Sequence, residues 1–182
     1  MIRRTLFLIL LCGTLQAYIY NDSLLIIYSK VVPRIMALDN TQRGGIQKRR
    51  LCILYEKGDA PVAEKLREQM LQNLPSRLKN GFSVEIGPYE ETGSAECAGS
   101  TALMLLDARP EKIARALKLA ERERLLTFSY SNSLLERGAA VSLMVGKEVY
   151  PVINIEAVKR SALKLDAALF QIARIYDGSK IR

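Results

Sequence analysis

The chain contains no histidine, and this limits the chemistry it can perform. A Ser-His-Asp or Cys-His arrangement is impossible without that residue, and zinc sites lose their commonest ligand. The turn after the first predicted strand, residues 56–61, reads Glu-Lys-Gly-Asp-Ala-Pro, which is neither a P-loop nor a GxGxxG motif. We therefore expect no catalytic residue, no metal site and no cofactor, and a hydrolase is the weakest functional hypothesis.

Polar side chains nevertheless follow the predicted strands. Open α/β sheets bind ligands at the carboxyl ends of their strands, so these groups could line a crevice for a small ligand or a peptide. The candidate ligand-binding residues are Glu56, Asp59, Asp107, Arg109, Ser129 and Asn132. The same residue types also form caps and turns at any loop edge. Glu56 and Asp59 could pair as acid and base, but nothing in the sequence positions a substrate between them.

Four short apolar segments are the strands that would position these groups. They cover residues 51–55, 83–86, 102–106 and 125–128. Helices are predicted between them, from residue 60 to about 78, with an apolar residue at every fourth position, and from residue 110 to about 120. A further helix over residues 24–32 should end or kink at Pro33. This alternation predicts a Rossmann-like or flavodoxin-like α/β sandwich with a mainly parallel sheet and flanking helices.

Composition and the N-terminus bear on the compartment. With 49% hydrophobic and 25% charged residues in 182, the chain has a globular balance. Residues 1–17 combine two arginines, a short apolar run and a terminal Ala17, which predicts a cleaved signal peptide followed by one domain over residues 18–182. An uncleaved membrane anchor is the alternative. The net charge of +8 falls to +6 without Arg3 and Arg4, and export argues against nucleic acid as the basic chain's partner.

Two cysteines, Cys52 and Cys97, remain after that cleavage. In an oxidising compartment an even count favours a disulfide, here between the first strand and the loop before the third. Rossmann-type folds place these two strands side by side, which supports the pairing. The alternative is that Cys52 is a small buried apolar residue.

The last third of the chain predicts further elements. A short helix over residues 134–137 should stop at Gly138. Apolar runs at 140–145 and 149–155 flank residues 146–148 and predict an antiparallel C-terminal hairpin. Pro151 cannot donate a backbone hydrogen bond, so the second arm should lie at a sheet edge. Apolar residues at spacings of three and four predict helical structure over residues 157–165 and 168–175.

Residues 125–175 resemble the C-terminal part of the YfiR-type periplasmic regulators. In that family a Gly-containing hairpin precedes Phe-x-Ile-Asn, a basic helix, Gly-Leu and a Leu-rich helix ending in Leu-Ala-Arg. The matching residues here are Gly138, Ile153, Asn154, Arg160, Leu163, Leu165, Leu169, Ala173 and Arg174. Ala162 occupies the usual Gly position, and Gly138-Ala139-Ala140 replaces the usual double Gly.

The resemblance implies a non-enzymatic periplasmic protein that binds and restrains an inner-membrane sensor, typically a diguanylate cyclase, and so controls cyclic di-GMP, biofilm formation and motility. It also implies a possible homodimer and an outer-membrane lipoprotein as a further partner. Arg160, Lys164 and Arg174 are our candidate partner contacts, although they could equally be a solvated helix face. The alternative function is a solute-binding component that presents a small ligand to a transporter or sensor.

Overall fold

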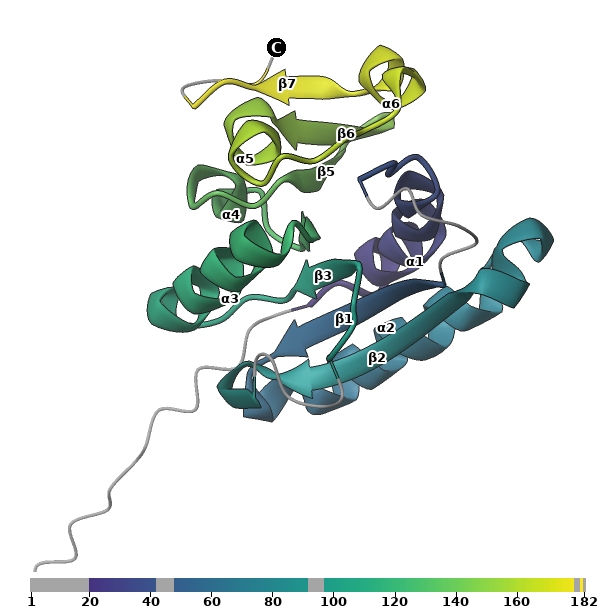
Figure 1. Ribbon diagram of the computed structural model, residues 1–182. Helices are drawn as coiled ribbons and strands as arrows, with labels where there is room; N and C mark the ends of the chain where they lie inside the picture. The colour runs from purple at the N-terminus through teal and green to yellow at the C-terminus, as the bar shows by residue number, and fades with distance from the viewer. Residues whose placement is uncertain (1–19, 42–47, 92–96, 179–180, 182) are drawn as a thin grey trace, which may run out of the picture.

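A computed structural model describes residues 20–41, 48–91, 97–178 and 181, and the predicted signal peptide lies outside them. A seven-stranded sheet in the order β2-β1-β3-β4-β5-β6-β7 forms its centre (Figure 1). The strands are β1 (Arg49–Tyr55), β2 (Phe82–Pro88), β3 (Ala102–Leu105), β4 (Leu126–Ser129), β5 (Val141–Val145), β6 (Val149–Asn154) and β7 (Arg174–Tyr176). All neighbouring pairs are parallel except β5 with β6. The prediction of a mainly parallel α/β sandwich with an antiparallel hairpin is confirmed.

Helices and short 3₁₀ turns connect these strands. The helices are α1 (Asp22–Met36), α2 (Ala60–Gln72), α3 (Pro110–Glu123), α4 (Ser133–Glu136), α5 (Ile155–Arg160) and α6 (Ala167–Ile172). The 3₁₀ turns are η1 (Lys57–Asp59), η2 (Ser76–Gly81) and η3 (Tyr89–Glu91). No helix in the described part of the chain combines the length and apolar character that crossing a bilayer requires.

The pleat of the central strands divides the core between the two faces of the sheet. Successive side chains of a strand point to opposite faces, so β1 and β3 contribute to both. Leu51 and Ile53 pack with the apolar sides of α1 and α2. Cys52 and Leu54 pack with Ile113 and its neighbours on α3. The central strands are thus covered on both faces, as their continuous apolar runs predicted.

The predicted helix over residues 168–175 is wrong in its second half. Helix α6 ends at Ile172, and Ala173 is extended, with φ −97° and ψ 157°. Arg174–Tyr176 then pair in parallel with Val152–Asn154 of β6. Backbone hydrogen bonds to this strand replace a further helical turn, and Ile175 still packs against the core. Apolar spacing alone could not show that β6 offers a free edge.

This extra strand also corrects the prediction about Pro151. Strand β6 is internal, between β5 and β7, and β7 forms the edge. Pro151 lies opposite Leu143 of β5, and pairing with β7 begins one residue later, at Val152. The nitrogen of Pro151 has no hydrogen to donate, so a proline is tolerated inside this sheet if no residue of β7 pairs with it. The pairing with β7 meets this condition, since it starts at Val152.

Other helix ends also differ from the prediction, and the helix predicted over residues 157–165 ends at Arg160, where Ser161 caps it. Helix α1 continues through Pro33 to Met36, and Pro33 is itself buried. Helix α2 ends at Gln72 instead of residue 78, because Asn73 caps it and Pro75 follows. Leu74 remains buried and Leu78 packs against the core from η2. The apolar stripe thus extends beyond the regular helix.

Candidate functional site

A disulfide joins Cys52 of β1 to Cys97, the first described residue of the segment that leads into β3. The two Cα atoms lie 5.4 Å apart and 45 positions apart in the sequence. Both residues are buried among the apolar side chains on the α3 face. Gly87 of β2 leaves room for this bridge, since a Cβ there would lie 2.9 Å from the Cys97 Sγ. The disulfide therefore ties a segment outside the sheet to its centre.

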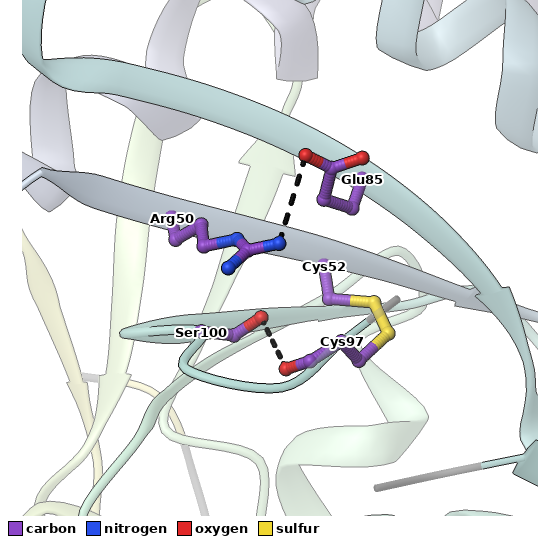
Figure 2. The surroundings of a disulfide bond; sticks show 5 residues. All are labelled: Arg50, Cys52, Glu85, Cys97 and Ser100. Atoms are coloured by element: carbon purple, nitrogen blue, oxygen red, sulfur yellow. Dashed lines mark hydrogen bonds and ion pairs between the residues drawn. A yellow bond between two sulfur atoms is a disulfide. The ribbon is translucent and has the colours of Figure 1, made fainter. Parts of the chain in front are cut away.

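Polar contacts lie close to the disulfide (Figure 2). The Ser100 hydroxyl donates to the Cys97 carbonyl oxygen at 2.8 Å, and Arg50 approaches Glu85 on β2 at 3.9 Å. The Thr101 N–H donates to the Arg50 carbonyl at 2.8 Å, and the Arg50 N–H donates to the Thr101 hydroxyl at 3.1 Å. Because the bonds between Thr101 and Arg50 do not involve the disulfide, they should keep Thr101 attached to β1 when the disulfide is reduced.

A buried lysine organises the carboxyl ends of β1, β2 and β3. Lys112 of α3, whose side chain is 5% exposed, pairs with Glu56 after β1 and with Glu90 after β2. The Arg109 N–H donates to Glu56 Oε1 at 3.1 Å, and the Arg109 Nε lies 3.6 Å from that oxygen. One cation thereby connects three loops that are far apart in sequence.

These pairs change the acidity of both glutamates. Burial alone would raise the pKa of Glu56, but hydrogen bonds from the Lys112 side chain and the Arg109 N–H outweigh it, and the net pKa is lowered. The Lys112 hydrogen bond is the main reason that the pKa of Glu90 is lowered. Both carboxylates therefore remain charged at neutral pH, and Lys112 and Arg109 together balance their two negative charges.

A second acidic pair lies beside this cluster. Asp59 is buried at the start of α2, and Asp107 is partly buried just after β3. The Tyr20 hydroxyl donates to Asp59 Oδ2 at 3.2 Å and lies 3.5 Å from the Asp107 carbonyl oxygen. The Tyr20 ring packs against Tyr130 at 5.0 Å between centroids. Tyr20, the residue before the N-cap of α1, thus occupies the predicted ligand crevice.

Burial raises the pKa of both aspartates, and a neighbouring negative charge adds to the effect. The neighbour is Glu56 for Asp59 and Asp59 for Asp107. A carboxyl group whose pKa is raised by folding stabilises the folded state below its unfolded pKa, and this contribution is lost as pH rises through the folded value. At neutral pH the ionised carboxylates of Asp59 and Asp107 therefore lower the free energy of unfolding.

We expect Asp107→Asn to increase stability at neutral pH, because the amide removes one of two mutually repelling charges. The gain should shrink as pH falls towards the unfolded pKa of aspartate, about 3.9, because a raised folded pKa lets the wild-type carboxyl groups take up protons in the folded state first. Thermal unfolding at about pH 4 and about pH 8 measures the difference. Asp166→Asn, which changes a carboxylate that caps α6 far along the chain, is the control. A variant that is less stable than wild type at the higher pH would contradict the prediction.

The six predicted ligand-binding residues do not form one site. Glu56, Asp59, Asp107 and Arg109 lie within the two connected clusters above. Ser129 is fully buried, and its hydroxyl donates to the Val141 carbonyl at 3.3 Å, while Asn132 is exposed before α4. Lys112 and Tyr20 were not among the predicted residues. The signal for Lys112 is its position four residues before Ala116 and eight before Ala120, on the buried side of α3.

The three predicted partner contacts come from different elements and not from one helix face. Arg160 ends α5, and Lys164 is exposed in the turn before α6. Arg174 is in β7, with its guanidinium carbon 5.3 Å from the centre of the Tyr150 ring. The described residues hold no group of three or more His, Cys, Asp or Glu side chains arranged for a metal ion.

Known structures share this fold. A conserved domain protein from Vibrio cholerae O1 biovar eltor matches 83% of the chain with a TM-score of 0.55 and 17% identity. The ABC domain from Streptococcus pneumonia, solved in complex with L-Trp, matches 79% with a TM-score of 0.55 and 10% identity. The chain covers only 59% and 60% of these two proteins. At such identities the likeness concerns the fold alone.

A sequence search of curated proteins found no match. The family comparison is more informative. A model described as YfiR/HmsC-like matches residues 39–174, which extend from just after α1 to the first residue of β7 and include Cys52 and Cys97. This match covers far more than the C-terminal motif on which the resemblance was based. The chain therefore belongs to the YfiR/HmsC-like family.

Proposed function

We propose that this protein is an exported, non-enzymatic regulator that binds the periplasmic part of an inner-membrane signalling protein and restrains it. The observation that carries the proposal is the family match over residues 39–174. A diguanylate cyclase is the proposed partner, which would place the protein in the control of cyclic di-GMP, biofilm formation and motility. An outer-membrane lipoprotein and a second copy of the chain are further proposed partners.

The restraint would act by population shift. A regulator that binds the inactive conformation of its partner more tightly than the active one increases the inactive fraction. The free-energy difference between the two conformations of the partner cannot change by more than the difference between the two binding free energies. A signal that weakens the preference for the inactive conformation therefore releases the partner without any catalytic step.

The disulfide is the proposed point of control. It connects the centre of the sheet to the segment that leads into β3, which is also hydrogen-bonded to β1 through Thr101. Reduction would release Cys97 from β1 while leaving the parallel strands paired. A partner that contacts this part of the surface would then bind less tightly, and the regulator would respond to the redox state of its compartment.

The test is the intracellular cyclic di-GMP level in a strain that lacks the protein. We expect the level to rise on deletion, wild type to restore it and Cys52→Ser to fail to do so. Ser100→Ala serves as a control variant in the same segment that retains the disulfide. An unchanged level in the deletion strain would refute control of a cyclase, and ligand screening would then test the solute-binding alternative.

A further inference from the structure

Three cationic side chains surround a cavity on the α3 face that belongs to neither cluster described above. The cavity has a volume of about 210 Å³ and lies between α3, the turn after α4 and the end of α5. Lys118, Arg137 and Arg160 line it, and Glu121 is the one carboxylate among the described lining residues. The lining therefore carries an excess of two positive charges.

Most of this charge is not neutralised within the protein. Arg160 Nε lies 3.9 Å from Glu121 Oε2, and both side chains are about half exposed. Such a pair is weak in water. In the described part of the chain neither Lys118 nor Arg137 forms an ion pair. An anion that entered the cavity would gain favourable interactions without displacing a strong internal partner.

The fold holds Arg160 at this position. Asn154 caps α5 by accepting the Ala157 N–H at 3.0 Å, and its amide donates to the Leu135 carbonyl at 2.7 Å, so α5 is attached to α4. Gly138 follows α4 with φ +109°, and a Cβ there would lie 2.9 Å from Arg160 Nη2. The missing side chain allows the guanidinium to approach the backbone beside the cavity. The site is thus partly preorganised, which reduces the entropic cost of binding.

The size of the cavity limits the ligand. A volume of about 210 Å³ has room for several water molecules or for one small anion. Inorganic phosphate or the phosphate group of a monoester fits this space, and its two negative charges would match the excess of positive charge. Arginine and lysine are the side chains that most often bind phosphate oxygens.

A shallower groove extends from the cavity along α3. Lys118 and Glu121 line both, and the groove adds Arg115, Leu119 and Arg122. The rest of a phosphate-bearing molecule could lie along this mixed basic and apolar surface. We propose that the cavity lined by Lys118, Arg137 and Arg160 is a binding site for a phosphate group, carried by a small soluble molecule or by a lipid headgroup.

Calorimetric titration of the full chain with inorganic phosphate at constant ionic strength tests this proposal. We expect binding to the wild type and an affinity about tenfold lower in Arg160→Gln and in Lys118→Gln, since each change removes a charged hydrogen-bond donor. Lys159→Gln is the matched control, because Lys159 is exposed on the same helix and pairs with Glu156 outside the cavity. Its affinity should equal that of wild type.

Two results would overturn the proposal. One is no binding of phosphate by the wild type at concentrations up to about 10 mM, a Kd so weak that no specific site exists. The other is equal affinity in Arg160→Gln, Lys118→Gln and Lys159→Gln. Glycerol phosphate and vesicles containing phosphatidic acid then distinguish the sources. Vesicle binding that Arg160→Gln abolishes identifies a lipid, whereas binding of the soluble ester alone identifies a small molecule.

Discussion

The oxidised wild type is expected to have a free energy of unfolding about 4 kcal/mol higher than the variant Cys52→Ser, Cys97→Ser, because the disulfide closes a loop across 45 positions. The bridge removes conformations from the unfolded chain that the open variant retains. For a domain of this size the difference corresponds to a Tm about 8–16 °C higher. Chemical denaturation of both proteins without reductant measures it.

Reductant provides the control for this experiment. Dithiothreitol should bring the stability of the wild type close to that of the double variant and should leave the variant unchanged. A variant that is as stable as the oxidised wild type would show that the disulfide contributes no stability. It would also weaken the proposal that its reduction alters the protein enough to release a partner.

Lys112→Met is expected to lower the free energy of unfolding by about 3 kcal/mol, because it leaves Glu56 and Glu90 without their buried cation. Both glutamates have pKa values lowered by the lysine hydrogen bonds. A lowered folded pKa contributes stability above the unfolded pKa, and this contribution disappears as pH falls through the folded value. The difference between wild type and Lys112→Met should therefore narrow in acid.

Lys118→Met is the matched control for this variant. It removes an exposed lysine from the same helix and should change stability by less than about 0.5 kcal/mol. Adding Glu56→Gln to Lys112→Met should recover part of the loss, since it removes one unpaired charge. If Lys112→Met and Lys118→Met unfold at the same denaturant concentration, the buried lysine does not hold the three loops together.

The fold class was predictable because it depends on local patterns. The apolar runs at 51–55 and 102–105 form central strands, and Pro61 and Pro110 lie in the first turns of α2 and α3. Cys52 and Cys97 could be paired in advance because a Rossmann-type order places β1 beside β3. Such inferences need only the period of the side chains and the positions of turns.

Long-range contacts determined the rest, because their energies depend on residues distant in sequence. Strand β7 forms since β6 leaves backbone groups unpaired, and no period within 168–175 contains that information. Tyr20 occupies the predicted crevice because α1 returns to the carboxyl ends of β1 and β3. Lys112 is the centre of a cluster because three loops converge on one buried position. Gly138 and Arg160 come together only when α5 packs against α4. The sequence alone predicts most of the helices and strands. The candidate sites depend on which distant side chains and unpaired backbone groups the folded sheet brings together.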